Sequence, residues 1–313
     1  MQREKRTFSG PLLEADFYPV FADGCKMPTR AQKSKPSTAE QQKYNDTMAV
    51  KKFIRLANAN FDTTDYIMHP TYAPALAPQD EKQARRDIVN YLRRVKTRRA
   101  SEAKKLKKDL TEANAAAKQM PGNKFLADSV KELKAKIEKL EAPFRYIYAI
   151  EKQTYKTGRY AGRANWHFHL FLTGGLDAKL LESMWTNGVR TNCNNFQPDK
   201  FGPEAAAIYM SKDPQGTKRF SYSRNLEQPA VPPPKDGKIS AYTVERMAKD
   251  RVDDRAYWER RYKGYRFLRC YARYNVYNGH WYVSVVMYRM DGQAPPWKAD
   301  DWLTEDYCDE RRS

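Results

Sequence analysis

The chain has 313 residues and a formal net charge of +19, with 57 Lys and Arg against 38 Asp and Glu. A hydrophobic content of 41% is enough for a core, but no apolar run approaches the length of a transmembrane helix. Four scattered cysteines without a C-x-x-C pair argue against a zinc site, and the chain lacks the phosphate-binding motif of an ATP-driven helicase. The positive charge predicts an anionic partner, nucleic acid before a membrane surface, and the cysteine usage fits a reducing cytosol.

The first hundred residues predict two helices and one strand. Residues 1–49 read as an N-terminal extension that is loosely structured to about residue 37, with one strand-like patch at residues 15–20. A helix begins at Ser37, the first residue of a capping-box sequence. Residues 65–72 predict a strand that leaves its sheet at Pro70. Residues 78–100 predict a basic helix, because their apolar side chains recur at helical spacing.

A helical hairpin and two strands are predicted next. Residues 101–141 are rich in Ala, Lys, Glu and Leu and are interrupted by Pro121-Gly122, which favours an inserted antiparallel helical hairpin. By composition alone this segment could be a solvated spacer without chemistry. Residues 144–152 and 165–173 then predict neighbouring strands joined by a basic loop.

The last third mixes short elements. We expect a short helix at 176–185, a strand or loop at 188–196 and a helix that opens at Gly202-Pro203-Glu204. After a Pro-rich linker at 229–235 come a helix near 241–261 and a β-hairpin around the turn Asn278-Gly279. Residues 229–313 are expected to pack on the preceding domain, with an acidic surface tail.

Two of the four histidines, His167 and His169, stand two residues apart within an apolar strand. In an extended strand, side chains at i and i+2 point to one face, so the two imidazoles project side by side. Such a pair can ligate a metal ion. The alternative is a pair of polar residues on the open face of a half-buried strand.

Tyr209 is the candidate nucleophile for cleavage of a phosphodiester. Lys212, three residues later on the predicted helix, would lie on the same face and contribute positive charge for a phosphate. Tyr209 is alone among the 21 tyrosines in being followed by Lys at this spacing. It could equally be an aromatic core residue of an amphipathic helix.

A hard divalent cation needs more than two histidines. Glu151 is the preferred third ligand, because adjacent antiparallel strands would bring it opposite the histidine pair. A solvent-facing glutamate at a strand end is the competing interpretation. His69, on another predicted sheet strand, is a weaker ligand candidate and more readily a structural or substrate-positioning residue.

In their order along the chain, these motifs resemble the HUH endonuclease superfamily, within it the replication initiators of small plasmids and single-stranded DNA phages. His167-Phe-His169 and Tyr209-x-x-Lys212 carry the resemblance, which covers about residues 50–226 apart from the hairpin. Asn60-Phe61 and the strand ending Pro70-Thr71-Tyr72 are similar to the family's first motif, a Thr-rich strand ending in Tyr, but His69-Pro70 stands where a simple Thr-rich strand is usual. The resemblance implies an α+β domain at 50–228, an antiparallel sheet with helices mainly on one face as in RNA-recognition folds, with residues 101–141 inserted.

The resemblance also implies an activity. Mg or Mn would be bound by His167, His169 and a third ligand, and Tyr209 would form a 5′-phosphotyrosine link to DNA while releasing a 3′ hydroxyl. The single tyrosine indicates a single-tyrosine enzyme, whose strand-closing step could require a second subunit at the origin. A helicase and polymerase would come from the bacterial host, in whose cytoplasm the protein would act.

Single-stranded or origin DNA is the expected partner. Its backbone would be held by basic residues around the site, namely Arg85, Arg86, Arg93, Arg94, Arg159, Arg163, Lys218, Arg219 and Arg224. Aromatic residues among them, such as Tyr155 and Tyr160, could stack unpaired bases or be ordinary loop residues. Two alternatives stay open: a relaxase or transposase of the same superfamily, and a non-catalytic single-strand-binding protein.

Overall fold

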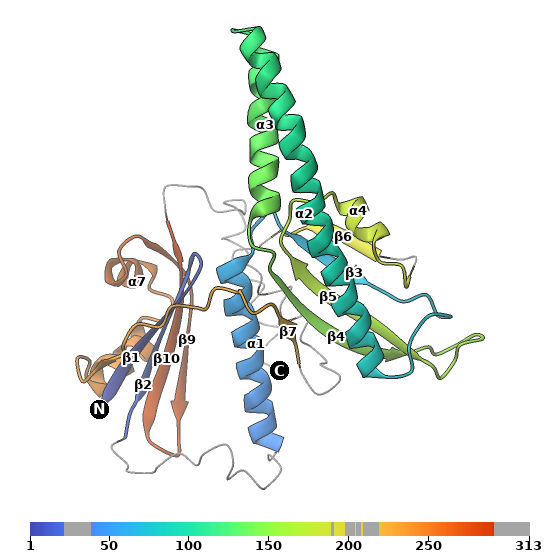
Figure 1. The fold of residues 1–313 in the computed structure, drawn as a ribbon. Coiled ribbons are helices and arrows are strands. Elements are labelled where there is room, and N and C mark those ends of the chain that lie inside the picture. Colours follow the sequence, from blue (N-terminus) through green and yellow to red (C-terminus); the bar gives the residue numbers. More distant parts are fainter. Residues whose placement is uncertain (22–38, 189–190, 198–203, 205–207, 209–218, 291–313) are drawn as a thin grey trace. The chain divides into compact units, whose positions relative to one another are not determined.

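The computed structural model describes residues 1–21, 39–188, 191–197, 204, 208 and 219–290, which form an α+β fold. Two five-stranded antiparallel sheets and six helices occur in these residues, so the expected fold class is confirmed (Figure 1). The chain divides into two compact units, one formed by Phe61–Gln197 with Ile208–Leu226 and the other by Met1–Asn60, Pro198–Ala207 and Glu227–Ser313. Within the described part, no helix has the length and apolar character needed to cross a membrane.

The unit from Phe61 to Leu226 is built on a sheet with the strand order β6-β3-β5-β4-β7. The strands are β3 (Tyr66–Pro70), β4 (Tyr146–Thr154), β5 (Ala164–Leu172), β6 (Thr191–Asn195) and β7 (Ser221–Tyr222). A short helix, α4 (Ala178–Ser183), follows β5. The histidine strand β5 is therefore the central strand, flanked by β3 and β4.

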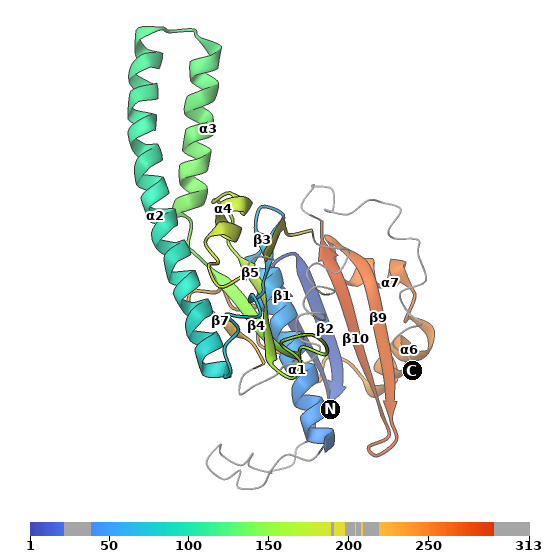
Figure 2. The same cartoon turned by 90° about the vertical axis from the view of Figure 1, so that its right-hand side faces the viewer.

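A single long helix, α2 (Glu81–Gln119), begins at its N-cap Asp80 and covers one face of this sheet with its first half. Ile88, Tyr91 and Leu92 pack there in one core with Phe168 of β5. The predicted basic helix and the first arm of the predicted hairpin are therefore continuous. Beyond residue 100, α2 pairs with α3 (Lys124–Glu141), and the two helices extend past the sheet (Figures 1 and 2).

Arg99 anchors this hairpin to the sheet. It is 2% exposed and donates hydrogen bonds to the carbonyl oxygens of Thr173, Gly174, Lys139 and Ala142. These carbonyls belong to the end of β5 and the C-terminus of α3, whose last carbonyls lack partners within the helix. A buried cation is thereby satisfied by backbone oxygens, as burial of charge requires.

The other unit carries the sheet β8-β1-β2-β10-β9. Its strands are β1 (Gln2–Ser9), β2 (Leu12–Pro19), β8 (Lys235–Asp236), β9 (Tyr265–Asn275) and β10 (His280–Arg289). Its helices are α1 (Ala39–Asn60), α6 (Ala241–Asp250) and α7 (Arg255–Arg261). The β9–β10 hairpin, predicted from its Asn-Gly turn, is confirmed.

Two expectations for this second unit differ from the structure. Residues 1–21, expected to be loosely structured apart from a strand-like patch at residues 15–20, form the β1–β2 hairpin, and they belong to the same compact unit as residues 227–313. The reason is that the buried face of β1 is polar, so it lacks the apolar alternation by which a strand is identified. The single helix expected at 241–261 is two helices, because Asp254 caps a new one.

Candidate functional site

Three neighbouring strands bring the predicted ligand residues to one face of the sheet. In the β4–β5 register, Glu151 lies opposite His167 and Ala149 opposite His169. On the other side of β5, β3 continues into a bridge between Thr71 and His167. Because side chains alternate between faces, these residues project away from the α2-covered core that holds Phe168. The expected adjacency of Glu151 to the histidine pair is thus observed.

His169 is at the centre of a hydrogen-bonded chain of side chains. Its Nε2 lies 3.0 Å from Oε2 of Glu151, and its Nδ1 lies 3.0 Å from Nδ1 of His69. The small Ala149 directly opposite leaves space for Glu151 to reach across diagonally. An ionised carboxylate only accepts, so Nε2 of His169 donates the proton in this contact, and one of the two Nδ1 atoms donates to the other.

His167 is held differently. Its Nδ1 lies 3.1 Å from Oγ1 of Thr71, whose hydroxyl is also 3.5 Å from the carbonyl oxygen of His69. Thr71 therefore accepts the Nδ1 proton of His167 and directs its own proton to that carbonyl. The Nε2 atom of His167 is buried and has no hydrogen-bond partner among the described residues. A neutral imidazole with Nδ1–H donating keeps its lone pair on this Nε2.

The electrostatics of the cluster favour the neutral forms of His69 and His167. Burial lowers the pKa of His69 to about 4, and the adjacent imidazoles of His169 and His167 act in the same direction. Burial also lowers the pKa of His167, although the charge of Glu151 opposes that shift. For Glu151, burial would raise the pKa, but hydrogen bonds from Gln153 and His169 outweigh it and the pKa is lowered. Neutral imidazoles beside an ionised carboxylate are the protonation states that bind metal ions.

The donor set fits a divalent cation. Nε2 of His169 and Oε2 of Glu151 lie 3.0 Å apart, and together with Nε2 of His167 they are the donor atoms that would hold a divalent cation. With Nε2 as a ligand atom, His169 would carry its proton on Nδ1, and His69 would accept that proton at Nδ1 while carrying its own on Nε2. Among the described residues, no three His, Cys, Asp or Glu side chains already have a metal-binding arrangement as they stand. The residues fit a divalent cation in two respects: their donor atoms are of the right chemical kind, and the buried Nε2 of His167 has no hydrogen-bond partner among the described residues.

The loop between β4 and β5 carries part of the predicted DNA surface beside this cluster. The guanidinium carbons of Arg159 and Arg163 lie 5.9 and 5.6 Å from the ring centroid of Tyr160, and the Tyr155 ring lies 6.3 Å from the same ring. A backbone hydrogen bond from Tyr155 N to Arg163 O closes the loop. Cations interleaved with aromatic rings are the chemistry of a single-strand-binding surface.

The other predicted DNA-binding residues lie farther along the same unit. On α2, Arg86, Arg93 and Arg94 are exposed, whereas Arg85 pairs with Glu81 and donates to Ser221 of β7. On either side of β7, Arg219 is half-buried and Arg224 is exposed. Tyr209, Lys212 and Lys218 lie outside the described residues.

Two residues acquire a place in the site that sequence reasoning assigns only weakly or not at all. The sequence makes His69 a weaker ligand candidate, and the structure places it in contact with His169 rather than beside the Nε2 atoms. Thr71 belongs to the segment that is similar to the family's first motif, but the sequence assigns it no role in the site. Its signal is the His69-x-Thr71 spacing, which repeats the period of the histidine pair and puts both side chains on one face.

Comparisons of the chain with protein-family models, with curated proteins and with solved structures found no match. The chemistry of the site is therefore indicated by its own geometry.

Proposed function

We propose that the protein is a metal-dependent single-strand DNA nicking and joining enzyme of the HUH type, which initiates rolling-circle replication. One observation carries the proposal. The two histidines of one strand have their Nδ1 atoms held by neighbouring side chains, while one Nε2 is buried without a partner and the other meets a carboxylate. Metal-binding histidines are oriented in this way by hydrogen bonds to the other ring nitrogen.

In this proposal, His167, His169 and Glu151 hold Mg or Mn. When bound, the cation polarises the scissile phosphate and stabilises charge on its oxygens. Thr71 and His69 hold the two rings and keep the proton on each Nδ1. Tyr209 attacks the phosphorus, a bond forms between its phenolic oxygen and phosphorus, and the bond to the 3′ oxygen breaks. The 3′ oxygen leaves with the proton that Tyr209 gives up, and Lys212 offsets negative charge on the phosphate.

The DNA strand would lie along the basic loop between β4 and β5. This loop joins the strand of Glu151 directly to the strand of His167, so bases stacked on Tyr155 or Tyr160 would lead a phosphate toward the ligands. A host polymerase would extend the released 3′ hydroxyl, and a host helicase would unwind the duplex. A second subunit at the origin would serve the strand-closing step.

The test is covalent capture of DNA. Purified wild-type protein with Mn²⁺ and a 5′-labelled single-stranded origin oligonucleotide should yield a nicked product and, with 3′ label, a protein–DNA adduct on a denaturing gel. Tyr209→Phe should abolish the adduct, while the matched Tyr222→Phe should retain it. An adduct that survives in Tyr209→Phe would show that the nucleophile is another residue.

Binding without cutting is the outcome that favours a different function. If the wild type binds the oligonucleotide but never cleaves it with Mg²⁺ or Mn²⁺, the protein is a single-strand-binding module. If it cleaves and rejoins only DNA from a transfer origin or a transposon end, it is a relaxase or transposase. His167→Ala should lose cleavage but keep DNA binding.

A further inference from the structure

The solvent-facing side of α2 carries a continuous row of positive charge that runs from the sheet onto the helical hairpin. At 3.6 residues per turn, eight exposed cations of α2 fall within about one third of the helix circumference, and seven of them have no carboxylate partner among the described residues. We call this row the basic stripe; it consists of Lys82, Arg86, Arg93, Lys96, Lys104, Lys108 and Lys118. All acidic residues of α2 lie outside that third.

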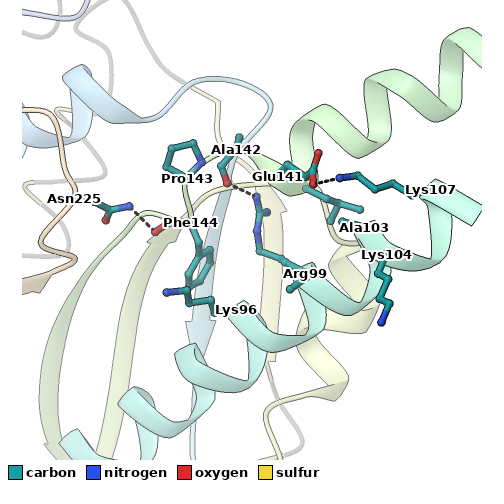
Figure 3. Close-up of a pocket in the computed structure, with 12 residues that line it drawn as sticks. Lys96, Arg99, Ala103, Lys104, Lys107, Glu141, Ala142, Pro143, Phe144 and Asn225 are labelled. Carbon is teal, nitrogen blue, oxygen red and sulfur yellow. Dashed lines mark hydrogen bonds and ion pairs between the residues drawn. The ribbon is translucent and has the colours of Figure 1, made fainter.

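The stripe is not neutralised by its surroundings. Among the described residues, none of its seven cations is paired with a carboxylate, and only Lys107, on the same side of the helix, is paired, with Glu141 of α3. At the base of the hairpin, Lys96 and Lys104 line a cavity of about 570 Å³, shown in Figure 3 with Arg99 turned inward to Ala142. The surface is therefore both positively charged and hollowed where the hairpin leaves the sheet.

The spacing of the stripe is close to half the helical repeat of a DNA duplex. Its cations fall into four groups, centred near residues 84, 94, 106 and 118, which are about 15–18 Å apart at 1.5 Å per residue. A straight line along a duplex crosses each of its two backbones once in each turn of about 34 Å, so it meets a backbone every ~17 Å on average. A flexible single strand has no such fixed repeat.

The helix α2 is also rigid enough to keep the spacing of these cations fixed. It is one uninterrupted element from Glu81 to Gln119, packed on the sheet in its first half and on α3 in its second. Arg99 ties both arms of the hairpin to the end of β5. The stripe from Lys82 to Lys118 spans about 54 Å, which corresponds to roughly 16 base pairs.

We infer that the helical hairpin is a duplex-DNA-binding arm, which lays the basic stripe along about 16 base pairs of double helix and touches backbone phosphates without reading sequence. The inference rests on the proposed function in one respect: the duplex would be the DNA that flanks the nicking site. The binding itself requires no cleavage, so it is measured whether or not the protein cuts DNA.

The experiment compares two variants that remove the same number of charges. The stripe variant combines Lys104→Gln, Lys108→Gln and Lys118→Gln, and the control combines Lys105→Gln, Lys131→Gln and Lys134→Gln, which are exposed residues off the stripe. Binding to fluorescein-labelled random-sequence duplexes of 8, 16 and 24 base pairs, and to a 24-nucleotide oligo-dT, is measured by anisotropy over a range of salt concentrations. Circular dichroism checks that both variants keep their helices.

For the wild type, affinity should rise with duplex length up to about 16 base pairs. In the stripe variant, the salt slope of log K for the 24-base-pair duplex should fall by about 2.7, because each lysine that no longer neutralises a phosphate lowers the slope by about 0.9. In the control, the slope should fall by less than about 1. Oligo-dT binding should be equal in the two variants. An equal decrease in duplex binding in both variants, or a larger decrease for oligo-dT than for the duplex, would overturn the inference.

Discussion

Replacing Thr71 with Val tests whether this residue, which follows β3, orients the His167 ring for metal binding. Valine keeps the branched shape and the backbone bridge to His167 but removes the hydroxyl that lies 3.1 Å from Nδ1 of that histidine. The ring then loses the acceptor that holds its proton on Nδ1. Loss of such an outer partner costs about 10- to 100-fold in metal affinity, which is roughly 1.4–2.8 kcal/mol.

The assay is titration of metal-free protein with Mn²⁺, followed by calorimetry or by the spin-resonance signal of free Mn²⁺. The matched control is Thr111→Val, which removes an exposed hydroxyl bonded only to its own helix, at Lys107 O. Thr71→Val should bind Mn²⁺ about 10- to 100-fold more weakly while the control binds it like the wild type. Unchanged Mn²⁺ affinity in Thr71→Val would refute the claim that Thr71 orients His167.

Three further outcomes are expected. Glu151→Gln, which removes the carboxylate charge next to His169, should weaken Mn²⁺ binding at least tenfold in the same titration. In EDTA, the free energy of unfolding should fall by about 2–3 kcal/mol as the pH drops from 6.5 to 4. The reason is that burial lowers the pKa of His69 to about 4, whereas the unfolded chain binds this proton near pH 6.5. His69→Asn should flatten this pH dependence in urea titrations. Arg99→Ala should cost roughly 3 kcal/mol in urea unfolding, because it leaves buried carbonyls without donors, whereas the exposed neighbour Arg98→Ala should cost less than about 0.5 kcal/mol.

Local patterns account for the elements that were predicted correctly. The turn at Asn278-Gly279 predicts the β9–β10 hairpin because a tight turn requires residues that tolerate a positive φ, and Gly279 has φ +67°. The apolar spacing from Ala84 to Val95 predicts the part of α2 that covers the sheet. The two-residue period places His167 and His169 on one face. Each of these signals is contained within about a dozen residues.

Other features have no local signal. The strand β1 buries Gln2, Glu4, Thr7 and Ser9, so its pattern is not that of a half-apolar strand, and its buried carboxylate is stabilised by Tyr262 from the far end of the chain. Such compensation is invisible along the sequence because the partner is 258 residues away. The division into two units arises in the same way, from pairing between β2 and β10.

The candidate site shows the same division between local and tertiary information. The sequence alone identified the histidine pair, the face that the two side chains share, and Glu151 as their neighbour. These features depend on strand periodicity and on two strands that are consecutive in the chain. Only the tertiary structure decided that His69 and Thr71 stand on the other side of β5 and hold the ring nitrogens. The physical reason is that strand pairing across about a hundred residues is selected by packing of the whole sheet rather than by any local preference.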